Sequence, residues 1–406
     1  MRLNVSVTYL QTASKTAEKR NIRIHTGKAF VRMFMAVTLL SFCACKTKNE
    51  PTKNEPAKND TTMSTQVQTP FYVGTYTDGD SEGIYKYELN PDGKLMRIGL
   101  MAKTENPSFL SFNNAKDVLL AVNEIEKGTV TSYAVRPDSL EQVSISDSGG
   151  SSPCFVTTNE DDFVLTANYG SGTVGLLQLD AAGKLSDLLD VQQHEGKGTN
   201  KERQEGPHAH SAWFAGENKV ISVDLGTNGL WLSTLNEKTK KLEPDTPRTV
   251  QLTPGAGPRH LVFHPNKPWF FVLSELDNTV TQFTMENGKY NRGANVSILD
   301  KNFTGLSSAA DIHISMDGRF IYASNRGEDT IAVIELSDDG PLKVIDHVSV
   351  RGQQPRSFKL SPNENFLVVA NQDSNNLVSF KRDSETGLLT YVSEIEAPKP
   401  VCVLFE

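Results

Sequence analysis

Hydrophobic and polar residues alternate in short runs along most of the chain, the pattern of β-strands that bury one face. The stretch 257–283 shows the unit that recurs. An opening proline, Pro258, precedes an alternating run, a turn at 264–267, an apolar run at 269–273 and a second alternating run at 279–283. No long amphipathic helical pattern appears after residue 70. The folded part of the chain is therefore predicted to be all-β.

Similar units follow one another at intervals of 45–54 residues. This period is typical of propeller blades with four strands each. Nothing between residues 100 and 400 resembles a linker, which disfavours the alternative of two separate β domains. The opening positions of the units are Pro107, Pro153, Pro207, Pro258, Ala309, Pro355 and Pro400.

The last opening strand, residues 400–405, has no unit behind it. At the other end of the domain, residues 72–76 and 83–89 predict a second and a third strand without an opening strand. We therefore predict a seven-bladed β-propeller in which the C-terminal strand completes the N-terminal blade. Such closure removes the free sheet edges that invite aggregation.

The first seventy residues differ from the rest. Basic residues precede an apolar run at 33–44, which is too short to span a bilayer and fits a signal sequence. Ala44 followed by Cys45 resembles a bacterial lipoprotein processing site. We predict a leader over 1–45, a disordered tether over 46–70, which is rich in Lys, Asn, Glu, Pro and Thr, and a propeller domain over 71–406.

This organisation predicts a protein of the cell envelope, periplasmic and attached to the membrane only through a lipid on Cys45. The alternative is a cytosolic protein whose start site lies further along the chain. The formal net charge is −8, and residues 1–44 contribute +6, which leaves −14 for the remainder. An acidic body argues against nucleic acid as a partner, whereas a small anion needs only a local basic pocket. We expect a monomer.

Four cysteines are present, none in a CxxC pair. Cys154 and Cys402 fall in predicted inner strands, so we expect buried free thiols.

The first strand of a propeller blade lines the central channel, so equivalent positions in different blades form a ring. Two arginines and a histidine fall at the position after the opening residue. The members of this first ring are Ser108, Cys154, His208, Arg259, Ala310, Arg356 and Val401.

A second ring is expected where each apolar second strand ends. Charges there are out of place for packing, and they favour a polar site at one mouth of the channel; structural ion pairs between blades are the alternative. The members are Glu124, Tyr169 or Gly170, Asp224, Glu275, Arg326 and Gln372.

The longest irregular stretch, 194–206, is expected to overhang this mouth. It precedes His208 and His210, which strand alternation places on one side. Two such histidines could bind a metal with Asp224 or Glu275 as a third ligand. A general base or a hydrogen-bond donor is favoured beside so many arginines, so no metal and no cofactor are expected.

Several motifs together resemble the seven-bladed propeller lactonase family, which includes propeller-type 6-phosphogluconolactonases and the fungal carboxymuconate lactonizing enzymes. The resemblance covers residues 71–406 and implies lactone ring chemistry without a required metal. The motifs are Tyr72-Val73-Gly74-Thr75-Tyr76-Thr77, Pro207-His208-Ala209-His210-Ser211, Asp224-Leu225-Gly226, Gly257-Pro258-Arg259-His260-Leu261-Val262-Phe263-His264-Pro265 and Ser324-Asn325-Arg326-Gly327.

In the lactonizing relatives a His, two Arg and a Glu form the site. By motif these are His208 or His210, Arg259 and Glu275, with Arg326 or Arg356 as the second arginine. Glu275 or a histidine would be the base, one arginine would stabilise the oxyanion and another would hold a phosphate or carboxylate. The remaining polar residues, Arg326, Arg356, Asp224 and Glu124, are expected to bind substrate.

The expected reaction is hydrolysis of a small anionic sugar lactone, 6-phospho-D-glucono-1,5-lactone above all. No G-x-S-x-G elbow surrounds any serine, so no covalent nucleophile is invoked. The alternatives are a cycloisomerase, a lactonase acting on a non-phosphorylated lactone, and a non-catalytic binding propeller of the envelope.

Overall fold

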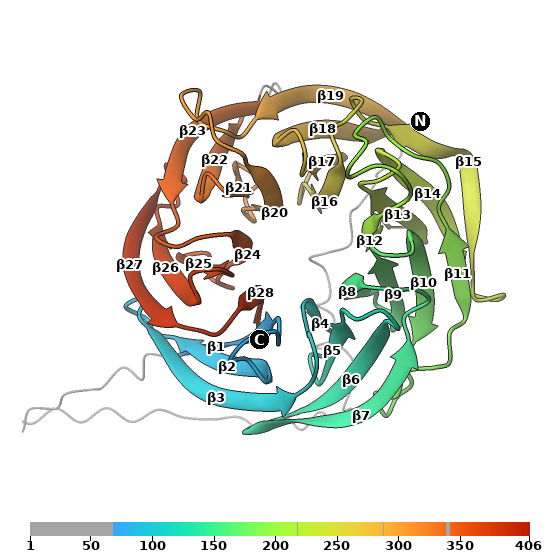
Figure 1. Cartoon of the computed structure of the whole chain (residues 1–406), viewed down its shortest axis with the longest axis horizontal. Coiled ribbons are helices and arrows are strands. Elements are labelled where there is room, and N and C mark those ends of the chain that lie inside the picture. The colour runs from blue at the N-terminus through green and yellow to red at the C-terminus, as the bar shows by residue number, and fades with distance from the viewer. Residues whose placement is uncertain (1–67, 217, 287, 338–341) are drawn as a thin grey trace, which may run out of the picture. The chain divides into compact units, whose positions relative to one another are not determined.

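The computed structural model describes residues 68–216, 218–286, 288–337 and 342–406. These residues form seven four-stranded antiparallel sheets arranged around a central channel (Figure 1). The predicted leader, and the predicted tether up to residue 67, lie outside the described residues. The first strand begins at Thr69, two residues before the expected domain boundary. None of the described residues belongs to a helix long and apolar enough to cross a membrane.

Every blade is a meander in which neighbouring strands are paired antiparallel. The first three complete blades consist of β4 (Leu110–Phe112), β5 (Val118–Asn123), β6 (Thr129–Arg136) and β7 (Ser139–Asp147); β8 (Pro153–Thr158), β9 (Phe163–Asn168), β10 (Thr173–Gln178) and β11 (Asp190–Gln193); and β12 (Ala209–Phe214), β13 (Lys219–Asp224), β14 (Gly229–Asn236) and β15 (Lys241–Gln251).

The next three blades have the same order. They consist of β16 (Pro258–Phe263), β17 (Trp269–Ser274), β18 (Thr279–Glu286) and β19 (Lys289–Ser297); β20 (Ser308–Ile314), β21 (Phe320–Arg326), β22 (Thr330–Leu336) and β23 (Leu342–Ser349); and β24 (Pro355–Leu360), β25 (Phe366–Asn371), β26 (Asn376–Arg382) and β27 (Leu389–Glu396).

The seventh blade joins the two ends of the described chain. Its strand order is β28 (Pro400–Phe405), β1 (Thr69–Thr75), β2 (Gly83–Leu89) and β3 (Leu95–Lys103). Figure 1 shows the last strand beside the first, and the pairing of Phe71 with Phe405 sets their register. The prediction of seven blades closed by the C-terminal strand is confirmed.

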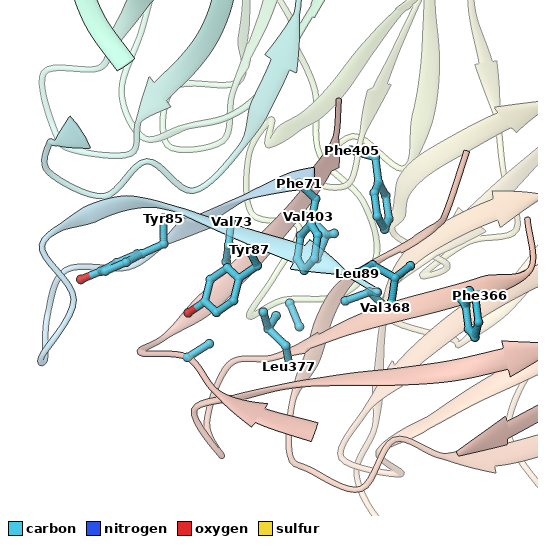
Figure 2. Packing of buried hydrophobic residues seen from close by; sticks show 12 residues of the cluster. Phe71, Val73, Tyr85, Tyr87, Leu89, Phe366, Val368, Leu377, Val403 and Phe405 are labelled. Carbon is cyan, nitrogen blue, oxygen red and sulfur yellow. The ribbon is translucent and has the colours of Figure 1, made fainter. Parts of the chain in front are cut away.

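Apolar side chains fill the space between neighbouring blades, because the inner strands are buried on both faces. At the closure, Phe71, Tyr87 and Phe405 of the seventh blade pack with Phe366 and Val368 of the preceding blade (Figure 2). The rings of Phe71 and Phe405 lie 5.1 Å apart. The antiparallel pairing of β28 with β1 therefore closes the ring, and hydrophobic burial within this blade and against the preceding one stabilises the closure.

The expectation for the cysteines is also confirmed. Cys154 and Cys402 are buried free thiols on the first strands β8 and β28.

Candidate active site

A β-bulge follows the start of most first strands. In β16, for example, Pro258 pairs with Ser274 and His260 with Leu273, which leaves Arg259 as the extra residue. A bulge re-aims the side chain of the unpaired residue. The same register shift leaves Cys154, Arg356 and Val401 unpaired in their blades, and all of these residues line one cavity in the channel.

In the third complete blade the first ring contains His210, not His208. Ala209 pairs with Asp224 and Ser211 with Val223, so His210 is the bulge residue. The sequence-based prediction took the residue after each opening proline as the member of the ring. Pro207 lies two residues before this strand, so the residue after it, His208, precedes the strand as well. The backbone carbonyl of His208 accepts from Leu225 N–H, the role that Gly257 has for Glu275.

The second ring needs a similar correction. The backbone N–H groups of Tyr76, Glu124, Tyr169, Glu275 and Gln372 each donate to the residue before an opening proline. Leu225, not Asp224, holds this position in the third complete blade.

Asp224 lies one residue earlier and is fully buried, where its carboxylate accepts hydrogen bonds from the backbone N–H groups of His208 and Thr227. The structure therefore does not bring Asp224 to the cavity, and its side chain organises the nearby backbone.

Glu275 is the centre of the site. Its Oε1 accepts a hydrogen bond from Arg203 Nη2 at 2.8 Å. Its Oε2 lies 2.9 Å from Arg326 Nη2 and 3.1 Å from Arg259 Nε. Three guanidinium groups from a loop and two blades thus share one carboxylate, which is only 5% exposed. Burial alone would raise the pKa of Glu275, but Arg326, Arg259 and Arg203 lower it to about 2.

The cations outnumber the anions around this carboxylate. Burial, together with the nearby charges of Arg326 and Arg356, lowers the pKa of Arg259 to about 10. Arg259 still carries its charge at neutral pH, and one of its Nη groups donates to the carbonyl of Ala310. A buried group of like charges is stabilised by an anion, so the site favours an anionic ligand.

Arg356 differs from the other arginines of the site. It lines the cavity and lies over the ring of Tyr76, with 5.2 Å between its Cζ and the ring centroid. Among the described residues it has no carboxylate within ion-pair distance and no hydrogen-bond partner. Its guanidinium edge is therefore available to a ligand.

Glu124 also lines the cavity and has few partners. Its Oε2 accepts a hydrogen bond from the Tyr76 hydroxyl at 2.9 Å. Burial raises the pKa of Tyr76, so this hydroxyl stays protonated and donates. Within the described part of the chain, Glu124 takes part in no ion pair and its Oε1 accepts no hydrogen bond.

Neither of the two candidate histidines is among the residues that line the cavity, although His210 contacts Cys154 and His260, which are. His208 stacks on Tyr169, with ring centroids 4.5 Å apart, and its Nε2 lies 3.1 Å from Glu205 Oε1. His210 is buried, and its Nδ1 lies 3.6 Å from Cys154 Sγ. Burial and then the charge of Arg259 hold the pKa of His210 well below its usual range, so this ring is neutral.

Sequence reasoning missed a buried chain of polar groups that reaches the cavity. His260 Nδ1 lies 3.3 Å from Asp311 Oδ1, and His313 Nε2 lies 3.3 Å from Asp311 Oδ2. Burial and Arg259 lower the pKa of His260 to about 4. Asp311 was the available signal, because it is the single carboxylate in the inner strand β20.

Arg203 was missed because it lies in the irregular stretch 194–206, where no periodicity marks a residue. This loop is anchored at its start, where His194 Nδ1 lies 2.7 Å from Asp224 Oδ2 and the imidazole stacks on Trp231. Near its end, buried Gln204 donates to the carbonyl of Leu225. The loop thereby holds Arg203 against Glu275.

The cavity itself is narrow, with about 250 Å³ of empty space, open solvent at its mouth included. No cluster of three or more His, Cys, Asp or Glu side chains suited to a metal ion occurs in the described ranges. The residues that line the cavity are Ser108, Phe109, Glu124, Cys154, Arg259, His260, Asp311, Arg356, Ser357 and Val401.

A seven-bladed ring with arginines and carboxylates in its channel matches a known class of proteins. Residues 70–405 match the family described as "Lactonase, 7-bladed beta-propeller". The chain belongs to this lactonase family, as the sequence motifs predicted.

Individual relatives share most of the chain. It is 39% identical over 344 residues to a 6-phosphogluconolactonase of Bacillus subtilis, covering 82% of this chain and 97% of that protein. A 6-phosphogluconolactonase of Formosa agariphila is 31% identical over 331 residues, covering 78% and 94%. The solved structure of a periplasmic gluconolactonase of Pseudomonas aeruginosa, PpgL, superposes with a TM-score of 0.80 at 29% identity, covering 84% of this chain and 99% of that one.

Proposed function

We propose that the protein hydrolyses 6-phospho-D-glucono-1,5-lactone to 6-phosphogluconate at this cavity. The observation that carries the proposal is Arg356, a guanidinium that lines the cavity without a carboxylate partner among the described residues. Arg259, which is crowded by other cations, lies in the same wall. Family membership supports lactone chemistry, and two relatives carry the name of this activity.

Opening a lactone places negative charge on the former carbonyl oxygen. Arg259 is suited to stabilise that charge, because it is buried and held in place by Glu275 and by the carbonyl of Ala310. A donor fixed before the reaction begins costs no reorganisation during it. Removal of one such donor typically costs about 3 kcal/mol of transition-state stabilisation.

Arg356 is suited to hold the anionic end of the substrate. A guanidinium offers two parallel N–H groups to a phosphate or a carboxylate, and Lys lacks this fork. The aromatic ring of Tyr76 supports one face of Arg356 and leaves its edge for the ligand.

The test measures hydrolysis of 6-phosphogluconolactone and of gluconolactone by acid release, corrected for spontaneous opening. We expect Arg356→Ala to lower kcat/KM for the phosphorylated substrate by about 10- to 100-fold, through KM, as for loss of a hydrogen bond of ~1.5–3 kcal/mol to a charged group. Arg351→Ala is the matched control, since Arg351 is exposed and lies over Tyr391. An unchanged kcat/KM in Arg356→Ala would contradict this assignment.

A second candidate is a lactone without phosphate. The relative from Pseudomonas aeruginosa is named a periplasmic gluconolactonase, and the N-terminal residues predict an envelope location for this chain. A higher kcat/KM for gluconolactone than for its 6-phosphate would favour this substrate. Radiolabelled palmitate incorporated into the wild type but not into Cys45→Ala would support the lipid anchor.

Two other outcomes remain distinguishable. Turnover of a muconate in place of any sugar lactone would indicate a cycloisomerase. An absence of turnover with every lactone would indicate a binding propeller.

A further inference from the structure

We infer that Glu124 is the general base that activates water for lactone opening, and that Glu275 positions the arginines instead. This inference rests on the proposed lactone hydrolysis. A base in this reaction must face the cavity and must have a free lone pair to accept a proton. The groups around the cavity can be compared on these two requirements.

Glu275 is not among the residues that line the cavity, and it fails the last requirement as well. Both of its oxygens are engaged by guanidinium groups, from Arg203 on one side and from Arg259 and Arg326 on the other. These cations stabilise the ionised carboxylate and so make it a poor acceptor of a proton. Proton transfer to Glu275 would also leave the surrounding cations without their counter-charge.

Asp311, His260 and Cys154, which do line the cavity, are not free to act as the base either. Asp311 accepts hydrogen bonds from two backbone N–H groups and lies against His260 and His313. His260 has Asp311 at Nδ1 and Arg259 at Nε2. Burial raises the pKa of the Cys154 thiol, which therefore remains protonated.

Glu124 satisfies the requirements together. It lines the cavity, and Oε2 has a single partner, the hydroxyl of Tyr76, while Oε1 accepts no hydrogen bond from any described residue. Its backbone is fixed by a hydrogen bond from its N–H to the carbonyl of Asn106. Arg356 and Arg259 line the same cavity, so the carboxylate faces the cations that would hold the substrate and its developing charge.

The reaction balances without any further reactant. The oxygen of a water molecule bonds to the acyl carbon while one of its protons passes to Glu124. The bond between the acyl carbon and the ring oxygen then breaks, and the ring oxygen takes the proton back from Glu124. The product is the open hydroxy acid, which releases its own proton to solvent.

Glu124→Gln keeps the shape of the side chain and removes the base. We expect kcat to fall by about 10²- to 10⁴-fold, the usual contribution of a general base, with a melting temperature equal to that of the wild type. Glu126→Gln, an exposed position two residues along the same loop, is the matched control and should retain full turnover. In Glu124→Ala, added formate should restore part of kcat, because a small carboxylate fits the space left by the side chain.

The outcomes distinguish a failure of the role of Glu124 from a failure of the proposed lactone hydrolysis. An active wild type together with a Glu124→Gln variant that keeps kcat within about threefold would overturn the role of Glu124 alone. The same conclusion follows if formate rescues Glu275→Ala and not Glu124→Ala. A wild type without activity on either lactone would overturn the proposed function and this assignment with it.

Discussion

Glu275 and Glu124 occupy the same position in two different blades, directly after the second strand, yet their surroundings differ completely. The N–H of each donates to the residue before an opening proline. Glu275 is shared by three arginines, whereas Glu124 has the hydroxyl of Tyr76 and an open side facing the cavity. The repeated backbone therefore fixes where a side chain stands, and the neighbouring blades and the loop decide what it can do.

The largest expected difference between the two carboxylates is in stability. Glu275→Gln leaves buried guanidinium groups without their counter-charge, and breaking such a pair typically costs about 3–5 kcal/mol. Glu124 forms no ion pair with any described residue, so for Glu124→Gln we expect a change below about 1 kcal/mol. Urea unfolding of both variants at pH 7 measures the contrast. Equal losses of unfolding free energy in the two variants would show that Glu275 does not stabilise the buried arginines.

The stability due to Glu275 should depend on pH. Its pKa is about 2 in the folded protein, against an ordinary value of 4.5. A carboxylate whose pKa is lower in the folded protein stabilises the fold at any pH above its pKa in the unfolded chain. This stabilisation is lost as the pH falls through the pKa of the folded protein. The shift corresponds to about 3 kcal/mol. The difference in unfolding free energy between wild type and Glu275→Gln should therefore be constant above about pH 5 and shrink towards pH 2. A difference that stays constant down to pH 3 would contradict the role of the arginines.

The comparison also shows how much of the fold and of the site can be predicted from the sequence. The blades, the closure and the clustering of Arg259, Glu275 and Arg326 follow from the repeat, because equivalent positions must meet around one axis. The sequence predicts Arg356 in the channel for the same reason. These parts of the site depend on register alone, which alternation and the opening prolines specify well.

Other parts of the site do not depend on register, or depend on a register that the sequence leaves ambiguous. Pro207 precedes its strand by two residues, so alignment of the blades by their prolines predicts His208 in the first ring. The β-bulge places His210 there instead. Asp224 was misplaced by one residue in the same blade. Arg203 reaches Glu275 from an irregular loop, and its position is set by buried anchors such as Gln204 that no periodic pattern reveals.

The smallest expected effect concerns Tyr76, which stands in the seventh blade at the position of the two glutamates. Tyr76→Phe removes the hydrogen bond to Glu124 and keeps the ring beneath Arg356. Because Glu124 faces the cavity, water can replace the hydroxyl, so a typical net loss of about 1 kcal/mol, or roughly fivefold in kcat/KM, is expected. Steady-state kinetics with Tyr76→Leu as a comparison separates the two functions of this residue, since only leucine also removes the support for Arg356 and should raise KM. If Tyr76→Phe instead lowered kcat as much as Glu124→Gln, the hydroxyl itself would have to take part in the proton transfer, and Glu124 would no longer act as the base on its own.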